Sequence, residues 1–489
     1  MSEHEIVIIG SGFGGIATAI RLVQAGITDF RILERRSFMG GTWCQNTYPG
    51  AAVDVHSPLY SLADEPWPWT QMFAERDELE AYTNAVIDKH DLRSKTVLEA
   101  NVSEVRWDEA RSRWIIRTEG AGTFEARVVV NASGPLSTPV VPDFPGRDRF
   151  AGVAFHTNGW NHAVDLRGKS VAVVGSGASA AQVIPAIAPE VGALHVFQRS
   201  PHWVLPRPDR SFSPVSRRLL SVHPLYRLLR WAIYWKLESR VVGFKYSPWA
   251  LDRFAQRHAL RHLAEQVPDP VLREKLTPGY TIGCKRIILS STLYPALCRP
   301  NVTLHDAADG IAEIEPGGIR TKQGTLVDLD VIVWATGYDA TDAVISYPVI
   351  GRGGRTLREF WDAYPRAYLG TCMPGFPNFF VLTGPNTGIG HTSALFIIES
   401  QLEYVLESIR RLRASGEAFV EVKPEAEERY TTMIHTEMER TVWKQGGCTS
   451  WYQGKNGQVV AMFPGFSFSY RALARRFRDE HHIFASEAA

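Results

Sequence analysis

Three glycines near the amino terminus are the first residues whose spacing could do chemistry. Gly10, Gly12 and Gly15 form G-S-G-F-G-G directly after the apolar run EIVII and before IATAIRLVQAG. The first glycine allows a tight turn, the second admits a pyrophosphate, and the third lets the following helix pack on the strand. Glu34 follows Gly15 by 19 residues and can accept both hydroxyl groups of an adenosine ribose. The segment predicts a site for FAD or NAD.

A second glycine-rich turn repeats this pattern with a different charge at the ribose position. The run SVAVV is followed by G-S-G-A-S-A, and Arg199 stands 19 residues beyond Ala180. A guanidinium can bind a 2′-phosphate through two hydrogen bonds, whereas Glu34 would repel it. The second segment therefore predicts an NADPH site. The residues expected there are Gly175, Ser176, Gly177, Ala180, Arg199 and Ser200.

Two nucleotide sites in one chain, one of them for NADPH, predict a flavoprotein that takes hydride from a nicotinamide. In disulfide reductases of similar architecture, a glycine–threonine step leads into two cysteines five positions apart. Here GGTWCQNTYPG places Trp43 and Tyr48 at those positions, and Cys44 has no partner cysteine nearby. Electron relay through a thiol pair is therefore disfavoured, and molecular oxygen is the expected acceptor.

The elements that must position these turns form a loose internal repeat. Each half also has a later apolar run, VVVNASG at 128–134 and VIVWATG at 331–337. Such runs are typical of buried parallel strands that end where a ligand approaches. The expected fold class is α/β, with two doubly wound, Rossmann-like dinucleotide-binding domains and a helical insertion. We expect the FAD-binding domain at 1–138 and 336–489, a linker at 139–151, the NADPH-binding domain at 152–205 and 278–335, and the insertion at 206–277.

The predicted insertion combines helical periodicity with basic and aromatic residues, including Trp231, Trp235 and Trp249. The stretch 217–240 is basic and apolar enough to suggest a helix on a membrane surface. However, charges interrupt it every few residues. A packed helical subdomain is the favoured interpretation.

Composition narrows the class of protein. The chain has 489 residues, 45% hydrophobic and 21% charged, which is typical of a globular enzyme with two or three domains. A net charge of +1 lacks the excess of positive charge that is typical of proteins that bind nucleic acids. No run of 18 uncharged apolar residues occurs, so no integral membrane association is expected and the cytoplasm is the predicted location. The five cysteines are scattered without a C-x-x-C pair, so neither a disulfide framework nor a zinc site is expected.

Further motifs resemble those of the Baeyer–Villiger monooxygenases, which use FAD and NADPH. Residues 40–54, GGTWCQNTYPGAAVD, resemble the family motif (A/G)GxWxxxx(F/Y)PxxxxD. Residues 150–160, FAGVAFHTNGW, resemble FxGxxxHxxxW, although Asn161 stands where the signature normally ends in Pro or Asp. Trp160 favours this branch over the flavin-containing monooxygenases, which usually have Tyr or Phe there. GCKR at 283–286 and SWYQGKN at 450–456 extend the resemblance over nearly the whole chain.

The resemblance implies roles for particular residues. Arg286 resembles the family's active-site arginine, which stabilises an anionic C4a-peroxyflavin and then its adduct with a ketone. Asp54 resembles the carboxylate that orients this arginine and lies close to the nicotinamide cofactor. Lys285 resembles a second partner of the 2′-phosphate, and Trp451 resembles a tryptophan that reaches the nicotinamide ribose from a mobile loop. The residues that would line the FAD are Thr42, Trp43, Tyr60 and Val102.

The implied reaction inserts one oxygen atom from O2 beside a ketone carbonyl and gives an ester or lactone. The expected partners are therefore a small-molecule ketone and O2. Two alternatives stay open, a flavin monooxygenase that oxygenates nitrogen or sulfur and an NADPH-dependent flavin reductase or electron-transfer protein. His156 is expected to lie at the connection between the domains rather than to act as an acid or base. The loop 384–391 has two equally compatible interpretations: it leads into a helix whose amino terminus points at the flavin, or it is a glycine-rich connection without a ligand. Linear, cyclic and aryl ketones, and any oligomeric state, are compatible with the sequence.

Overall fold

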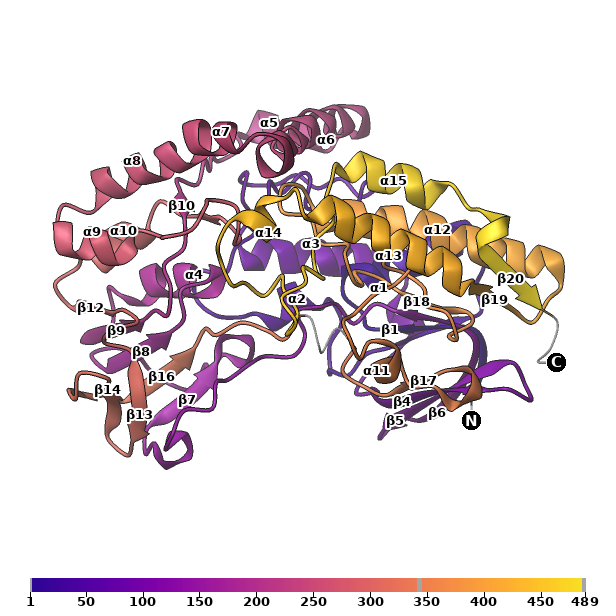
Figure 1. Cartoon of the computed structure of the whole chain (residues 1–489), viewed down its shortest axis with the longest axis horizontal. Helices are drawn as coiled ribbons and strands as arrows, with labels where there is room; N and C mark the ends of the chain where they lie inside the picture. Colours follow the sequence, from indigo (N-terminus) through magenta and orange to yellow (C-terminus); the bar gives the residue numbers. More distant parts are fainter. Residues whose placement is uncertain (1, 341–344, 486–489) are drawn as a thin grey trace.

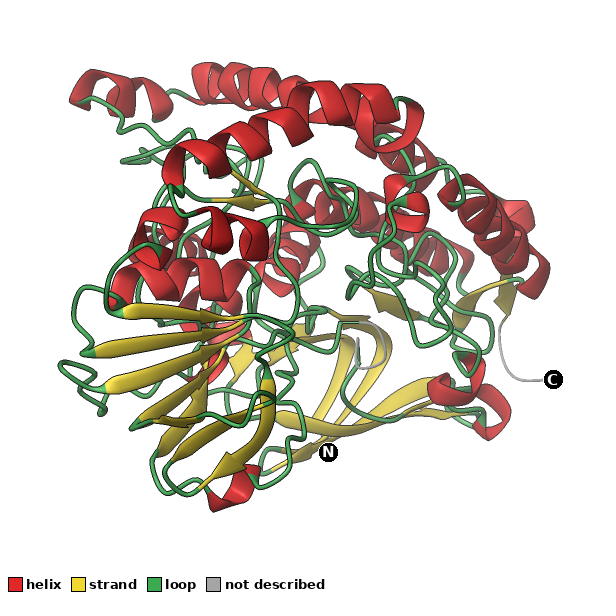
Figure 2. Cartoon of the chain, turned by 60° about the vertical axis from the view of Figure 1, so that its left-hand side comes forward, coloured by secondary structure: helices red, strands yellow, loops and turns green. Residues whose placement is uncertain are grey.

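Two sheets organise the computed structural model, which describes residues 2–340 and 345–485 (Figure 1). The outermost residues of the predicted FAD-binding domain, and residues 341–344 within it, lie outside this description. In both views most helices lie above the two sheets, and one group of helices lies along the upper edge of the molecule, away from both sheets (Figures 1 and 2).

The first sheet joins strands from both ends of the chain. Its order is β17–β4–β5–β6–β1–β2–β3, and β18 also pairs with β6. β1 pairs in parallel with β2 and β6, whereas β4, β5 and β6 form an antiparallel meander. The strands are β1 (Ser2–Ile9), β2 (Phe30–Leu33), β3 (Thr96–Val97), β4 (Asn101–Asp108), β5 (Arg113–Glu119), β6 (Gly122–Asn131), β17 (Val349–Ile350) and β18 (Phe379–Val381).

The second sheet is built from the middle of the chain and is parallel throughout, in the order β12–β9–β8–β16–β7. Its central strands β8 and β16 consist almost entirely of buried valine, isoleucine, alanine and tryptophan, as expected for a sheet covered on both faces. Its strands are β7 (Val153–His156), β8 (Ser170–Val174), β9 (Ala193–Phe197), β12 (Val302–His305) and β16 (Val331–Trp334). A small antiparallel sheet of β13 (Ile311–Glu315), β14 (Gly318–Thr321) and β15 (Leu326–Asp328), which the sequence analysis did not predict, packs beside it.

A helix follows the first strand of each glycine motif, as the two turns require. α1 (Phe13–Gln24) follows β1, and α4 (Ala178–Ile187) follows β8. α12 (Ala394–Ser415) packs against α1 and buries Leu395, Ile398 and Leu402 in the same hydrophobic core. The sheets fall within the two predicted domains, whose boundaries stay a prediction. The remaining helices of eight or more residues outside the insertion are α3 (Arg76–Lys89), α13 (Pro424–Met438) and α15 (Ser467–Arg475).

The segment predicted as a helical insertion forms a chain of helices along one edge (Figures 1 and 2). One face of helix α6 (His223–Glu238) packs on the body of the protein through Tyr226, Ile233 and Leu237, which are buried. Tyr226 accepts a hydrogen bond from Trp69 Nε1 at 2.9 Å. The helices are α5 (Pro214–Leu220), α6 (His223–Glu238), α7 (Pro248–Ala250), α8 (Arg257–Gln266) and α9 (Pro270–Leu276), with single-turn π-helices at Val242–Tyr246 and Leu251–Gln256. Within the described residues, no helix is long and apolar enough to cross a membrane.

Candidate active site

A cavity of about 250 Å³ lies at the end of β1, around the first glycine turn. Gly10 has a φ of +101°, and a Cβ atom there would lie 2.7 Å from the carbonyl oxygen of Ala132. A Cβ atom on Gly15 would collide with the carbonyl oxygen of Gly10, so this glycine allows α1 to pack closely on the turn. The predicted residues that line the cavity are Gly10, Gly12, Glu34, Thr42, Tyr60 and Val102.

The carboxylate of Glu34, at one side of this cavity, is fixed in position by three hydrogen bonds. Its carboxylate is 5% exposed and accepts hydrogen bonds from the backbone N–H of Ser11 at 3.0 Å, from Ser11 Oγ at 2.6 Å and from the N–H of Arg36 at 3.0 Å. Gly12 caps α1 without a side-chain hydrogen bond, so the first-turn N–H groups of this helix face the cavity unblocked. A ribose at Glu34 and a pyrophosphate at α1 fit this arrangement. Ser11 is a positioning residue that the sequence analysis missed.

Trp43 lies behind the cavity wall rather than in it. Its Nε1 atom donates to the hydroxyl oxygen of Tyr60 at 3.3 Å, and the two rings meet edge to face with centroids 5.8 Å apart. Burial raises the pKa of Tyr60, so this phenol stays protonated. The structure therefore places Trp43 in contact with Tyr60, where it holds the tyrosine ring in position. Gly15 does not line the cavity either, and its role is to let α1 pack closely on the turn.

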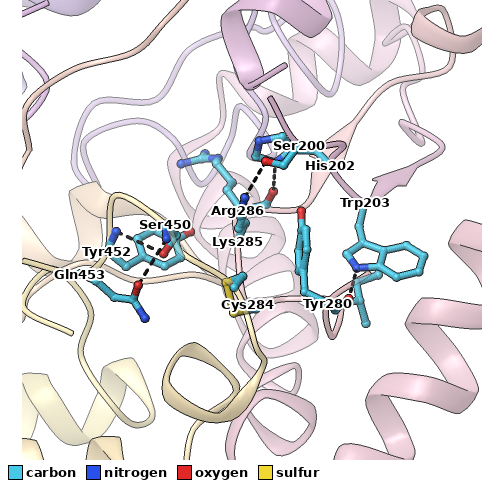
Figure 3. Close-up of a disulfide and its surroundings, with 12 residues drawn as sticks. Ser200, His202, Trp203, Tyr280, Cys284, Lys285, Arg286, Ser450, Tyr452 and Gln453 are labelled. Carbon is cyan, nitrogen blue, oxygen red and sulfur yellow. Dashed lines mark hydrogen bonds between the residues drawn. A yellow bond between two sulfur atoms is a disulfide. The ribbon is translucent and has the colours of Figure 1, made fainter. Parts of the chain in front are cut away.

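At the second glycine turn Lys285 lies against Ser200 (Figure 3), and Arg199 precedes Ser200 in the chain. Ser176 Oγ donates to the carbonyl oxygen of Ser200 at 2.7 Å, and Lys285 Nζ donates to Ser200 Oγ at 2.8 Å. Burial, and then the positive charge of Arg199, lower the pKa of Lys285. The two positive charges repel each other, and a bound phosphate with two negative charges would relieve this repulsion.

The backbone of this second turn also matches the first. Gly175 has a φ of +137°, and a Cβ atom there would collide with the carbonyl oxygen of Ala335. Gly177 caps α4 without a side-chain hydrogen bond, and Ala180 is fully buried in the first turn of that helix. All six residues predicted for the second nucleotide thus lie around one helix amino terminus, with Lys285 beside them.

Arg286 and Asp54 form a two-pronged ion pair on the wall of a larger cavity, of about 750 Å³. Arg286 Nε donates to Asp54 Oδ2 at 2.7 Å and its Nη2 donates to Oδ1 at 2.5 Å. The side chains stay 43% and 25% exposed because they face this cavity. The negative charge of Asp54 raises the pKa of Arg286, and this outweighs burial, which acts in the opposite direction. The guanidinium is therefore a fixed positive charge with one side open to a ligand.

The carboxy-terminal segment and the insertion complete the large cavity. Trp451 and Tyr452 both line it, and their rings lie 4.6 Å apart. Burial raises the pKa of Tyr452 to about 12. An apolar part of the wall comes from the insertion, through Val242, Phe244 and Leu251 among others. Spacing along the sequence gave no sign of which insertion residues would line the cavity.

The two cavities adjoin at the beginning of α12. Pro135, Leu136, Thr383 and Ala394 line both of them. Ser393 caps this 22-residue helix by accepting a hydrogen bond from the N–H of Leu395 at 3.2 Å. Of the two interpretations of the loop 384–391, this position favours a helix amino terminus aimed at a bound ring system, where its partial positive charge would meet developing negative charge.

The expectation that the cysteines form no disulfide was wrong. Cys284 and Cys448 are bonded, with Cα atoms 6.1 Å apart across a separation of 164 residues (Figure 3). The bond connects the segment before Lys285 and Arg286 with the segment before Trp451. The spacing of the cysteines in the sequence could not reveal this pair, because only the folded structure brings the two segments together. Cys44 is buried and unbonded, as expected of a small core residue.

His156 and Trp160 lie where a packing role requires them. His156 Nδ1 accepts a hydrogen bond from the N–H of Asn158 at 3.0 Å, and its ring packs edge to face against Tyr338. Burial lowers the pKa of His156. The ring of Trp160 packs edge to face on Phe155 at 5.0 Å. Among the described residues that line the two cavities, neither His156 nor Trp160 is found.

Comparisons with known proteins agree with this geometry. A family model described as pyridine nucleotide-disulphide oxidoreductase matches residues 7–223. A Baeyer–Villiger monooxygenase from Pseudomonas aeruginosa is 43% identical over 489 residues, which cover 99% of this chain and 92% of that protein. An oxidized steroid monooxygenase bound to NADP is similar with a TM-score of 0.89, at 32% identity over 99% of this chain and 100% of that one. A complex of OTEMO with FAD and NADP gives a TM-score of 0.90, at 27% identity over 99% of both chains. The chain therefore belongs to the Baeyer–Villiger monooxygenases, and its fold is the predicted α/β class.

Proposed function

We propose that the chain uses O2 and NADPH, with FAD as its bound cofactor, to convert a small ketone into an ester or lactone. The observation that carries the proposal is the fixed guanidinium of Arg286, held by Asp54 on the wall of an apolar cavity that adjoins the first nucleotide site. FAD and NADP are also the ligands named for the solved relatives. When bound, FAD reduced by NADPH supplies the activation of O2.

The residues around the first glycine turn fit FAD. Gly10 and Gly12 leave room for the pyrophosphate, Glu34 accepts the ribose hydroxyls, and Thr42 and Tyr60 line the path toward the large cavity. Val102 lies at the same cavity, and Trp43 keeps Tyr60 in place. The partial positive charge at the beginning of α12 would face the ring system between the cavities.

The residues around the second turn fit NADPH. Arg199, Ser200 and Lys285 would bind the 2′-phosphate, and the uncapped amino terminus of α4 would bind the pyrophosphate. Trp451, on the wall of the large cavity, would close over the nicotinamide ribose.

Arg286 would act on the ketone. Its pKa is raised by Asp54, so it remains protonated at any working pH and can stabilise negative charge that develops on the ketone oxygen. Asp54 restricts the guanidinium to one orientation through two hydrogen bonds, which makes the charge pre-organised before substrate arrives. The apolar wall keeps water away from the reacting carbonyl and strengthens this interaction.

The test separates the two halves of the reaction. In Arg286→Ala, NADPH should still reduce the flavin at a near-normal rate, while ester formation should fall by about 100-fold or more. Arg286→Lys keeps a positive charge but loses the two-pronged pair, so it should recover ester formation only in part. Sulfide or amine oxygenation that exceeds ketone oxygenation in the unaltered enzyme would favour the nitrogen- or sulfur-oxygenating alternative. Flavin reduction without any oxygenated product would favour a reductase. The proposal keeps the predicted cytoplasmic location, which fractionation of cells tests.

A further inference from the structure

Two neighbouring helices of the insertion expose large apolar side chains. On α6, Leu225, Leu228, Trp231 and Trp235 follow one another at intervals of three or four residues, and Val215 and Leu219 are exposed on α5, which packs beside α6. Leu228 and Trp231 are 61% and 60% exposed. We call these six residues the apolar ridge.

The side chains of the apolar ridge are not needed to pack the insertion on the rest of the protein. The opposite face of α6 already makes its contacts with the body, through Tyr226, Ile233 and Tyr234. The Tyr234 ring, for example, stacks on Phe396 of α12 at 4.9 Å. Among the described residues, only Trp235 of the ridge has a ring partner outside the insertion, which is Phe468 at 5.8 Å. A patch of large apolar side chains on the surface of a soluble protein marks a site of interaction.

Charge distinguishes the possible partners of this surface. Residues 214–257 contain nine arginines and lysines but only two acidic residues, whereas the whole chain has a net charge of +1. One of the two acids, Glu238, is buried and bonded to His391, so it does not offset the surface charge. The exposed cations on the two helices of the ridge are Arg217, Arg218, Arg227 and Lys236.

A second copy of this chain is a poor partner for the ridge. A symmetric dimer would press the same basic surface against itself, and like charges that close are repulsive. An anionic lipid surface satisfies both properties at once. Leucine and tryptophan side chains enter the boundary between headgroups and acyl chains, and arginine and lysine contact the lipid phosphates.

The ridge is also next to the large cavity. Val242 and Phe254, which follow α6, line the cavity that contains Arg286. Trp249 lies between them in the chain, packs edge to face on Phe254 at 5.8 Å and does not line the cavity. Its side chain is 66% exposed, so the cavity wall lies close to the outer surface of the insertion here. An apolar ketone dissolved in a bilayer would meet the cavity from this side.

We propose that the apolar ridge docks this protein on the surface of anionic membranes, without crossing them, and that apolar ketones enter the cavity from the membrane side. The second half of the statement rests on the proposed function, whereas the docking does not.

Binding to vesicles tests the docking directly. The FAD-loaded protein is mixed with vesicles of phosphatidylcholine alone or of phosphatidylcholine with phosphatidylglycerol, and the bound fraction is measured by flotation. We expect binding to the anionic vesicles, at least tenfold weaker binding to the neutral ones, and weakening as salt is raised. Absence of binding to anionic vesicles, or equal binding to both kinds, would overturn the proposal.

Variants assign the binding to the ridge. Leu228→Glu with Trp231→Glu should lower binding to anionic vesicles at least tenfold, while FAD content and turnover of a water-soluble ketone stay unchanged, because neither side chain lines a cavity. The matched control is Val271→Glu on α9, which replaces an equally exposed apolar side chain outside the ridge and should leave binding unchanged. Equal loss in the control would contradict the assignment.

Two further measurements keep docking apart from catalysis and from dimerisation. If vesicle binding is normal but no ketone is oxygenated, the proposed function fails and the docking stands. If sedimentation shows that the unaltered protein is a dimer that the ridge variant dissociates, the ridge is a contact between copies and the docking proposal fails. Where docking and turnover are both present, anionic vesicles should raise the rate for a long-chain ketone and leave the rate for a short one unchanged.

Discussion

Replacing Lys285 by methionine should change the choice between NADPH and NADH. Lys285 Nζ lies 2.8 Å from Ser200 Oγ, beside Arg199, in the group of residues that would bind the 2′-phosphate. A hydrogen bond that involves a charged group contributes about 1.5–3 kcal/mol, which corresponds to about 10- to 150-fold in affinity. We therefore expect kcat/KM for NADPH to fall by that factor, and kcat/KM for NADH, which lacks this phosphate, to change little.

The same lysine predicts a dependence on pH. Burial and the charge of Arg199 lower the pKa of Lys285 in the free protein, and a bound dianionic phosphate would raise it again. A group whose pKa rises on ligand binding makes its full contribution to the binding affinity at pH values below its pKa in the free protein. That contribution is lost as the pH rises through the pKa in the complex. The KM for NADPH should thus rise at alkaline pH, and this rise should disappear in Lys285→Met.

The assay is the anaerobic rate of flavin reduction, followed by flavin absorbance over a range of NADPH and NADH concentrations. A matched control is Lys322→Met, which removes a lysine whose Nζ donates to the carbonyl oxygen of Ala307 instead. An equal fall for NADPH and NADH in Lys285→Met would refute the reasoning, because the lysine would then act on a part shared by both cofactors. A fall in Lys322→Met would show that the effect is one of overall charge.

Three more predictions concern the frame of the site. Glu34→Ala should lower the FAD content of the purified protein, measured as flavin absorbance per chain, because Ser11 loses its partner and the ribose loses its acceptor; an unchanged flavin content would contradict this role. Gly15→Ala should destabilise the protein by about 1–3 kcal/mol in urea unfolding, since its Cβ has no room between α1 and the turn; a stability equal to that of the unaltered protein would show that the helix shifts freely. Cys284→Ser with Cys448→Ser should lower stability by about 2–4 kcal/mol in the same assay, and a reducing agent should lower the unaltered protein to the same value; insensitivity to the reducing agent would show that the thiols are not bonded in solution.

The sequence predicted the parts of the site that follow directly from strand–turn–helix order. Glu34 and Arg199 each stand at the end of the strand after a glycine turn, so local order alone brings them to the ribose position. Arg286 could not be placed in this way, because it faces Asp54 from 232 residues away, and only its resemblance to a family motif indicated it.

The parts that were missed depend on contacts distant in the sequence. The disulfide pairs two cysteines without any spacing signal. The apolar wall of the large cavity includes Val242, Phe244 and Leu251, which lie in two π-helical turns that nothing in the sequence distinguishes from the rest of the insertion. Ser11 is different, because it stands between the first two glycines of the motif. A hydroxyl group within the glycine turn, followed by an acid at the ribose position, was a signal that the sequence carried.

The order of strands in the first sheet also bears on how the chain is made. β18 pairs with β6, so this sheet is finished only after residue 381 has left the ribosome, whereas the second sheet needs nothing beyond residue 334. Because synthesis proceeds from the amino terminus and contiguous units fold as they emerge, the parallel sheet in the middle of the chain should form first. Until the last third of the chain arrives, the end of β6 that β18 covers, residues 129–131, is exposed and able to pair wrongly. A chaperone that binds nascent chains would therefore be needed most during synthesis of residues 132–378.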